Sequence, residues 1–590
     1  MNADFLICEL NQLDQAIQPF INWFAVRKGI MSNWFRIYFT FEKITIMQYR
    51  LICLLAISVC LFSCNKIPNH AKYIPKDAQL VGCIDMNKMG KKLIWNALTG
   101  SELFAEMQKN MKNEDTKMAM KDISNIGLDQ NSSIYFYING KRAQEGSTCL
   151  VVGMKDASKF ETFIKKTYPD LVFEKGQGYT KALIENSILA AWNKEVALFY
   201  PLIQSNTNGM MNFSMNNLSA IQSQLKENFS RSKANSILSN DHFKTLQNNG
   251  HDMSIWMNYE ELYNQNADPS SNPFIKQEYF KEAGLATGLD FEKGKVNAVM
   301  DYYMGAEMAT IYKKFEPQSI DLSMAEKLPS DDIAVLFGYN LNPQLLQEYL
   351  KKFGLDGLLN MGLGLAGTSM DNISSTFKGD MIFALSDMKI NETDSSQTHQ
   401  NITSAPDMNM TLAMTIKDQQ GLEKLLGIGV KNKILIKKGN GYSLPDSNQK
   451  SGFLYNKKYM VYSSDAMMAN RFIEGKSNSN KSYPSSVWKH FSSSPMIFFM
   501  DIKKVLQVVK TEPQNQEETE FINQARNFFT YMEMYGGKIK NNAVHVEGGL
   551  FLTNEKENAL IQLLDLGMKA KKLNDNKQIE TNQVDSLLVQ

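Results

Sequence analysis

The sequence lacks the short motifs that mark most catalytic and metal sites. It contains no Gly-x-Ser-x-Gly elbow, no His-Glu-x-x-His pair and no phosphate-binding loop. The six histidines are scattered, with no two four residues apart and none beside a cysteine pair. The sequence therefore predicts no metal and no cofactor. These absences lower the expectation of an enzyme without excluding one, because carboxylates that only folding brings together leave no motif.

An excess of charge of one sign is also lacking. Lysine plus arginine number 63, aspartate plus glutamate number 62, and no basic block stands out. A chain without a basic surface is not expected to bind nucleic acid. The hydrophobic fraction of 43% and the aromatic fraction of 11% instead predict ordered globular material.

Cysteine is scarce in the part of the chain that is expected to fold. Four of the six cysteines lie before residue 65, namely Cys8, Cys53, Cys60 and Cys64. Only Cys83 and Cys149 remain, each in a strand-like apolar run. In an oxidising compartment these two could form a disulfide, and two buried thiols explain them equally well. The sequence leaves both interpretations open.

The apolar run Leu51–Phe62 is too short to span a bilayer, which needs about 20 residues. With Arg50 before it, the run fits the core of a secretory signal peptide, and residues 47–63 are interpreted as one. Leu61-Phe62-Ser63-Cys64 resembles a bacterial lipobox, in which the cysteine receives the lipid and becomes the new N-terminus. The alternative is a buried apolar helix with an incidental cysteine.

Residues 1–46 precede this signal, although a signal peptide normally begins close to the initiating methionine. Met47 stands where a start is expected, so residues 1–46 are interpreted as an over-extended start. The alternative is a genuine N-terminal extension. Residues 64–73 are predicted to form a tether that reaches at most about 35 Å when extended. The polar tail 571–590 is expected to fray.

The body of the chain contains one pattern twice. Lys175–Tyr179 (KGQGY) matches Lys438–Tyr442 (KGNGY), and at the same offset Trp192–Phe199 aligns with Tyr455–Tyr462 without a gap. Further pairs keep the same order, among them SIYFYI with DMIFAL and MSIWMN with MIFFMD. We therefore predict a duplication into two homologous halves, residues 74–320 and 321–570. A solenoid would repeat every 20 to 50 residues instead.

Strand and helix patterns alternate within each predicted half. Polar breaks at Glu185-Asn186 and Asn193-Lys194 are spaced like turns between antiparallel strands, and the segments around Gly294 and Asn541-Asn542 look like further hairpins. A helix is predicted at Leu218–Phe229. The predicted fold class is α+β: two homologous halves, each a mostly antiparallel sheet packed with helices.

Two kinds of glycine-rich segment are candidate binding loops. Gly362–Gly367 (GLGLAG) matches a dinucleotide fingerprint by letter, but it follows a helix-like run, so a flexible turn is the preferred interpretation. The Lys-Gly-x-Gly-Tyr segments are predicted to be tight turns in which glycine supplies positive φ, with a ligand loop as the alternative. Their candidate residues are Gly176, Gly178, Tyr179, Gly439, Gly441 and Tyr442.

The lipobox, the opening Ile74-Pro75-Lys76-Asp77-Ala78, the Lys-Gly-x-Gly-Tyr turn and the two-fold layout together resemble a domain-of-unknown-function family of Bacteroidetes envelope lipoproteins. The resemblance covers nearly the whole chain after Cys64. It implies a Gram-negative cell-envelope lipoprotein with acyl chains such as palmitate on Cys64, no assigned activity and no known site residues. Surface-exported lipoproteins of that phylum usually carry acidic residues after the cysteine. Residues 65–70 have none, so the resemblance favours an outer-membrane protein that faces the periplasm.

Three functions remain open from the sequence. The first is non-enzymatic binding or assembly of an envelope protein or ligand at a surface between the halves, with the lipid on Cys64 as the contact to the membrane. The second is an envelope or glycan hydrolase with carboxylates clustered in a cleft between the halves. The third is lipid binding in a methionine-lined cavity, suggested by the 34 methionines.

Overall fold

The computed structural model describes residues 67–92, 126–129, 131–140, 147–202, 218–266, 276–389, 407–445, 451–475, 484–491, 493–508, 515–570 and 572–573. The chain divides after Lys66, and the unit Ile67–Gln590 is considered by itself. The predicted signal peptide, Cys64 and the region before them lie outside the described residues, as does most of the predicted tail.

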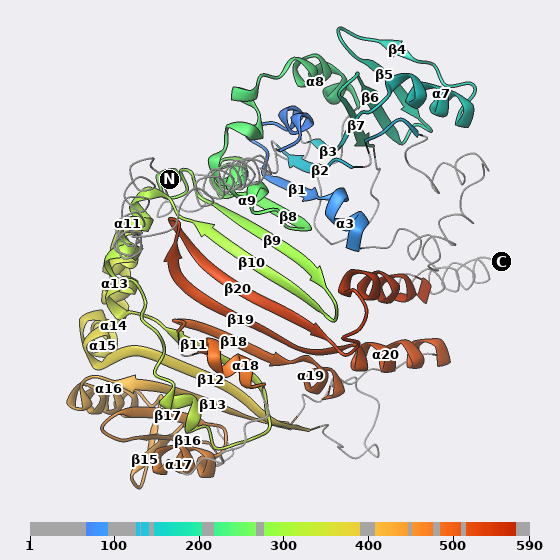
Figure 1. The fold of residues 1–590 in the computed structure, drawn as a ribbon. Helices are drawn as coiled ribbons and strands as arrows, with labels where there is room; N and C mark the ends of the chain where they lie inside the picture. The colour runs from blue at the N-terminus through green and yellow to red at the C-terminus, as the bar shows by residue number, and fades with distance from the viewer. Residues whose placement is uncertain are drawn as a thin grey trace, which may run out of the picture. The chain divides into compact units, whose positions relative to one another are not determined.

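The described strands pair into one antiparallel sheet, whose central members are labelled in Figure 1. The earlier ten strands are β1 (Leu80–Ile84), β2 (Ile134–Asn139), β3 (Ser147–Gly153), β4 (Glu174–Lys175), β5 (Thr180–Ile184), β6 (Ile188–Trp192), β7 (Val196–Pro201), β8 (Met253–Asn258), β9 (Gly284–Glu292) and β10 (Lys295–Tyr303). The later ten are β11 (Ile333–Asn340), β12 (Phe377–Lys389), β13 (Asp407–Ile416), β14 (Ile436–Lys438), β15 (Gly441–Ser443), β16 (Gly452–Tyr455), β17 (Tyr459–Ser463), β18 (Met496–Asp501), β19 (Phe529–Lys540) and β20 (Ala543–Leu552).

The strand order is symmetric about the central pair β10–β20. Outward from β10 the neighbours are β9, β8, β1, β2, β3, β7, β6, β5 and β4. Outward from β20 they are β19, β18, β11, β12, β13, β17, β16, β15 and β14. Each strand thus has a counterpart ten strands later at the same distance from the centre. The matched sequence segments fall on counterparts: SIYFYI on β2 with DMIFAL on β12, and MSIWMN on β8 with MIFFMD on β18.

The predicted hairpins are confirmed, because their turn residues adopt the backbone angles that tight turns require. Glu185 and Asn186 have φ of 48° and 54° between β5 and β6, and Asn541 and Asn542 have φ of 52° and 65° between β19 and β20. Positive φ at both central residues matches the right-handed twist of the flanking strands, and asparagine tolerates it well. Gly294, with φ of 67°, serves the β9–β10 turn.

Helices lie between the strands, so the α+β class is confirmed. They are α3 (Met86–Lys92), α7 (Ala157–Thr167), α8 (Leu218–Ser230), α9 (Asp241–Asn249), α10 (Tyr259–Asn266), α11 (Ala306–Lys314), α12 (Ser323–Glu326), α13 (Pro343–Lys352), α14 (Asp356–Ala366), α15 (Met370–Thr376), α16 (Gln419–Lys431), α17 (Ala466–Glu474), α18 (Ser485–Phe491), α19 (Ile502–Val508) and α20 (Gln516–Phe528). Short 3-10 helices are η1 (Asn69–Tyr73), η3 (Lys233–Asn235), η4 (Ile237–Ser239) and η5 (Gln277–Tyr279). Asp156 and Asp418 cap α7 and α16 by accepting hydrogen bonds from first-turn N–H groups. No described helix combines the length and the apolar character that a membrane span requires.

The described part of the predicted tether 64–73, from Ile67 onward, packs against the core. Asn69–Tyr73 forms η1, and Ala71, Tyr73 and Ile74 are at most 2% exposed in the core beneath β1, β2 and β3. Ile67 packs against the same core. Burying each large apolar side chain of this segment stabilises the fold by about 1.5 to 3 kcal/mol. This gain favours the packed conformation despite the polar residues between them. The described residues therefore contact the core from Ile67 onward, three residues after Cys64.

The prediction of a flexible turn at Gly362–Gly367 is wrong. Helix α14 runs through Gly362 and Gly364 and ends at Gly367, which adopts φ of 90° as its C-cap. Each glycine inside a helix costs about 1 kcal/mol, and the leucines and methionine between them are good helix formers. A glycine just past the last turn is a common helix end, because it enters the left-handed region without strain.

Candidate functional site

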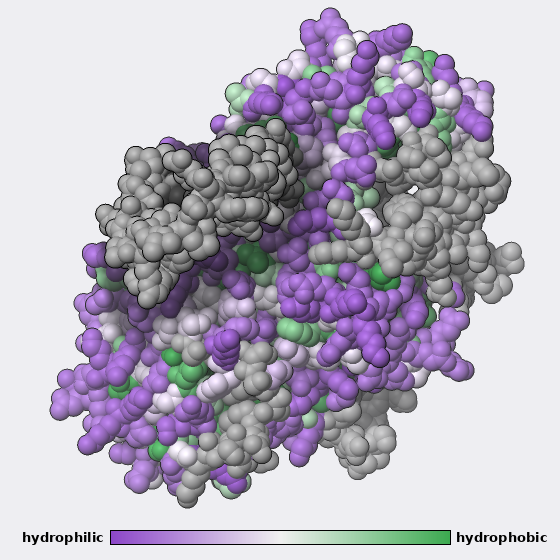
Figure 2. Space-filling view, in the orientation of Figure 1, coloured by the Kyte–Doolittle hydropathy of each residue, from purple (hydrophilic) through white to green (hydrophobic). Residues whose placement is uncertain are grey.

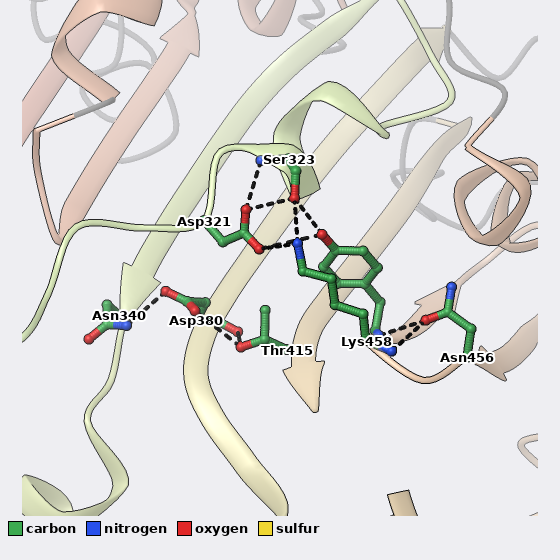
Figure 3. A network of polar contacts seen from close by, with 8 residues as sticks. Asp321, Ser323, Asn340, Asp380, Thr415, Asn456 and Lys458 are labelled. Atoms are coloured by element: carbon green, nitrogen blue, oxygen red, sulfur yellow. Dashed lines mark hydrogen bonds and ion pairs between the residues drawn. The ribbon is translucent and has the colours of Figure 1, made fainter. Parts of the chain in front are cut away.

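A polar cluster joins the segment before β11 to the β16–β17 turn (Figure 3). Asp321 Oδ2 lies 2.9 Å from Lys458 Nζ, and the Ser323 hydroxyl donates to Asp321 Oδ1 over 2.6 Å. Ser323 Oγ is also 3.2 Å from Lys458 Nζ and hydrogen-bonded to the Tyr459 hydroxyl. A serine hydroxyl beside a lysine and a tyrosine is a geometry that can generate a nucleophile.

The charge state of Lys458 argues against that role. A general base must be able to lose its proton near neutral pH. The hydrogen bond to Asp321 holds the pKa of Lys458 far above its usual range, so the ammonium keeps its proton. Burial pushes the pKa of Asp321 upward, but the hydrogen bonds from Lys458 and Ser323 outweigh it and leave this pKa lowered. The cluster is a stable ion pair rather than an activated serine.

The β6–β7 turn, which is the counterpart of the β16–β17 turn, carries a similar ion pair with its charges exchanged. Lys72, which precedes β1, lies 2.5 Å from Glu195 in the β6–β7 turn, and the Tyr73 hydroxyl donates to the same carboxylate over 3.0 Å. Asn193 and Asn456 each accept two backbone N–H bonds within their turns. One ion pair thus fastens the entering segment to the same turn in both places, which is a structural function.

A second cluster crosses the central pair of strands. His545 on β20 sits opposite Asp301 on β10, and its Nδ1 is 2.6 Å from Asp301 Oδ1. Its Nε2 is 2.9 Å from Glu547 Oε1, while Glu547 Oε2 accepts a 3.1 Å bond from the Tyr535 hydroxyl on β19. The His545 hydrogen bond contributes most to the lowered pKa of Glu547. With both ring nitrogens facing carboxylates, His545 has none left for a substrate, so the cluster joins β10, β20 and β19.

Two further histidines flank this cluster. His242 from α9 stacks on Tyr303 of β10 with 3.7 Å between ring centroids, and His490 from α18 stacks on Tyr535 with 3.9 Å. Three histidines that are far apart in sequence therefore gather around β10, β20 and β19. Among the described residues no group of histidine, cysteine and carboxylate side chains is arranged to hold a metal.

A polar cavity beside α8 is the best candidate for a binding site. Its volume is about 390 Å³, and it lies between α8 and the ends of β2 and β3. The residues that line it are Pro75, Asp77, Tyr137, Asn139, Ser147, Ala220, Ser223, Gln224, Glu227, Asn228 and Arg231. This space, called the α8 cavity below, is in the size range of sites for small ligands.

Arg231 is the unusual member of the lining. Its side chain is only 8% exposed, yet its Nε has no hydrogen-bond partner. Its Nη2 donates to Asn228 Oδ1 over 2.5 Å, and Nη1 is 3.9 Å from Glu227 Oε1, which is a long and weak ion pair. Asn228 is itself held by donating to the Tyr200 hydroxyl over 3.0 Å. A buried guanidinium with an unused donor is costly unless a further partner completes it.

The lining chemistry suits a polar ligand with an anionic group. The planar guanidinium of arginine binds carboxylates and phosphates through paired donors. The amides of Asn139 and Gln224 can donate to or accept from hydroxyl groups, and the Asp77 carboxylate can accept from them. Tyr137 also belongs to the lining. An acidic sugar or a sugar phosphate combines these features.

Cys83 and Cys149 are free, buried thiols rather than a disulfide. Cys83 on β1 faces Tyr135 and Cys149 on β3 faces Tyr137, so strand β2 stands between them. Two strand spacings amount to about 10 Å, whereas disulfide-bonded residues need Cα atoms within about 7 Å. Burial raises the pKa of the Cys83 thiol to about 11 and that of the Cys149 thiol to about 12.

Both thiols are therefore expected to resist alkylation in the native protein. At pH 8 the reactive thiolate is almost absent, and burial blocks access. Iodoacetamide followed by peptide mass mapping should leave Cys83 and Cys149 unmodified under native conditions for at least about 100 times as long as in 6 M guanidinium chloride. Rapid native alkylation of either residue would contradict the described packing.

The predicted Lys-Gly-x-Gly-Tyr loops do not meet. Gly176, Gly178 and Tyr179 form the β4–β5 turn at one end of the strand order, whereas Gly439, Gly441 and Tyr442 form or adjoin the β14–β15 turn at the other. The positive φ falls on Gly178 in the first turn and on Gly439 in the second, so the two turns also differ in conformation. Tyr179 stacks on Phe229 with 4.7 Å between ring centroids, which gives it a packing function. The two turns therefore lie at opposite ends of the strand order, and the ligand-loop alternative for either turn stays a prediction.

The residues of the α8 cavity were not predicted from the sequence, although helix α8 itself was. Asn139 lies on β2, whereas Asn228 and Arg231 lie at the end of α8, and together they form no motif. One usable signal was present: only four arginines follow residue 66 in this lysine-rich chain, namely Arg142, Arg231, Arg471 and Arg526. A rare arginine beside a predicted amphipathic helix was worth singling out, because arginine and lysine are not interchangeable at anion sites.

A family model described as "Domain of unknown function (DUF4836)" matches residues 70–560 of the chain. Two solved structures, described as crystal form IV and crystal form I of TP0453, match with 8% identity each. They cover 41% and 44% of this chain and 85% and 89% of the matched chains, at TM-scores of 0.22 and 0.23. Likeness at that level supports no conclusion about this chain. No curated protein matches the sequence.

Proposed function

The chain belongs to the DUF4836 family of unknown function, and we propose from its own residues that it is a cell-envelope lipoprotein that binds a small anionic, hydroxyl-bearing ligand without transforming it. The observation that carries the proposal is the buried side chain of Arg231, which belongs to the lining of the α8 cavity and whose Nε has no hydrogen-bond partner. A ligand carboxylate or phosphate would complete its hydrogen bonds. None of the lining residues is a methionine, so this cavity does not favour acyl-chain binding.

Membrane attachment through acylated Cys64, at the outer membrane facing the periplasm, is part of the proposal. It rests on the lipobox and on the family resemblance. We also propose that the body of the chain arose by duplication into two homologous halves. The ordered set of sequence matches and the symmetric strand order about β10–β20 support this history. The charge-exchanged ion pairs Lys72–Glu195 and Asp321–Lys458, which join counterpart turns to the segments before β1 and β11, add to it.

Binding is tested with glucuronate and glucose 6-phosphate as anionic probes and glucose as the neutral one. Calorimetric titration of the wild-type chain is expected to detect the anionic probes more strongly than glucose. Arg231→Ala is expected to weaken the anionic probes by about 10- to 100-fold, the loss of one or two charge-assisted hydrogen bonds, while glucose changes little. Arg231→Lys should recover only part of the loss, because an ammonium cannot pair two oxygens in one plane.

Arg471→Ala is the matched control, since Arg471 is exposed on α17 and lines no part of the cavity. It removes the same charge and should leave all affinities unchanged. Equal binding of the three probes, or an Arg231→Ala variant that binds the anionic probes as the wild type does, would overturn the proposed ligand class.

A further inference from the structure

Large apolar side chains that stay exposed are concentrated in one part of the described chain. Four belong to helix α14: Leu358, Leu359, Met361 and Leu365, which are 58%, 36%, 62% and 87% exposed. Three belong to the segment from the end of α16 to β14: Val430, Ile434 and Ile436, which are 36%, 58% and 43% exposed. The few others in the described residues are Leu150, Val172, Ile188 and Met467, from separate elements.

The two segments are neighbours. Asn432, at the C-terminal end of α16, donates from Nδ2 to the carbonyl oxygen of Ala366 at the end of α14, over 3.0 Å. No residue of α14 is buried, although the helix contains five leucines and methionines. These seven exposed side chains, together with the helix that carries four of them, are called the apolar patch below.

Positive charge accompanies the apolar patch. Lys431, Lys433, Lys437 and Lys438 are interleaved with its aliphatic residues and exposed, and neither 357–370 nor 427–441 contains an acidic residue. The corresponding segment before the β4–β5 turn has Tyr168, Asp170, Glu174 and Lys175 at the same positions. The basic character is therefore a property of this segment and is not required by the turn.

We propose that the apolar patch docks on an anionic lipid surface, as a contact separate from any acyl chain on Cys64. Aliphatic side chains enter the boundary of the acyl region, while lysines extend their ammonium groups to anionic headgroups. Each lysine near such a surface adds to the attraction. Helix α14 has 11 residues and is about 16 Å long, so it lies in the interface and does not cross the membrane.

A lipid surface fits the patch better than a protein does. Interfaces between proteins are enriched in aromatic residues and arginine and depleted in lysine, whereas this patch has no aromatic side chain and is interleaved with four lysines. A second copy seated on the same patch would bring the two sets of lysines together. On the face seen in Figure 2 the described residues are mainly hydrophilic with scattered apolar spots, which is ordinary for a protein surface. Seven exposed apolar side chains on two adjoining segments are not ordinary.

The test places an environment-sensitive nitrobenzoxadiazole dye on the full chain through Leu365→Cys. Met467→Cys is the matched control, because Met467 is 69% exposed on α17 and outside the patch. Cys83 and Cys149 are buried, and a chain without an added cysteine gives the background from the remaining thiols. The labelled chains are mixed with phosphatidylglycerol vesicles or phosphatidylcholine vesicles that contain doxyl-labelled lipid.

We expect doxyl quenching of the dye at position 365 in phosphatidylglycerol vesicles to be at least about twice that at position 467. Changing Lys431, Lys433, Lys437 and Lys438 to glutamine should weaken vesicle binding by at least about tenfold and remove the preference for phosphatidylglycerol. Equal quenching at the two positions would overturn the proposal. So would shielding of position 365 that grows with protein concentration in the absence of vesicles, because it would identify a second copy as the occupant.

Discussion

Trp256→Ala is expected to lower the free energy of unfolding by about 3–5 kcal/mol, the usual cost of removing a fully buried tryptophan. Trp256 lies on β8 with 1% exposure, between β1 and β9. The Trp256 ring lies across Gly284. A Cβ atom on residue 284 would come within 2.3 Å of the ring, so only glycine leaves room for this side chain. Truncation leaves a cavity that the paired strands cannot close. Urea unfolding followed by circular dichroism measures the change.

Phenylalanine substitutions separate packing from hydrogen bonding. The Trp256 indole N–H is buried without a partner, so Trp256→Phe loses only contact area and should cost clearly less than the alanine change. The matched case is Trp192→Phe, where the indole donates to Glu161 Oε1 over 3.1 Å and that bond is lost as well. If Trp256→Ala unfolds at the wild-type urea concentration, the described core is incorrect.

Gly536→Ala is expected to destabilise the protein by about 2–4 kcal/mol, through backbone strain and a forced displacement together. Gly536 has φ of 147°, and a Cβ there would lie 2.3 Å from the carbonyl oxygen of His545. It belongs to a β-bulge on β19, together with Gly537, whose carbonyl accepts a 2.5 Å hydrogen bond from the buried Tyr312 hydroxyl. Bulges re-aim side chains locally, and this one lies beside the His545 cluster.

Gly567→Ala is the matched control for that prediction. Gly567 is exposed in the helical stretch 559–570, with open space where a Cβ would go. Alanine there should stabilise the helix by about 0.5–1 kcal/mol. Gly536→Ala is expected to lower the unfolding midpoint and Gly567→Ala to raise it. A Gly536→Ala chain as stable as the wild type would show that the bulge can relax without cost.

The sequence was informative wherever structure is decided by near neighbours. The hairpin turns at Glu185-Asn186 and Asn541-Asn542 follow from a few adjacent residues. The α+β class follows from those same alternating patterns. The part of helix α14 from Gly362 onward was missed because its glycines suggested a turn after the helix-like run, whereas the leucines between them sustain the helix. The packed start at Ile67 was missed because its burial depends on strands far along the chain.

The candidate site was beyond the reach of the sequence for a different reason. Arg231, Asn139 and Asp77 gain significance only when α8 lies over β2 and β3, and that arrangement depends on pairings between distant segments. His545 and Asp301 are 244 residues apart and meet only because β10 pairs with β20. Spacing rules detect sites that one helix or loop carries, and neither of these clusters is of that kind.

The pairing of β10 with β20 has a mechanical consequence. The ladder runs from Lys295 opposite Phe551 to Tyr302 opposite Val544, with Asp301 and His545 adding a side-chain link across it. Rotating the strands on the β10 side against those on the β20 side would break all of these hydrogen bonds at once. The centre of the sheet therefore cannot serve as a hinge. Closure of the two sides of the sheet around a ligand is not expected. We therefore expect the proposed ligand to enter a cavity that is already formed, at a rate governed by access past α8.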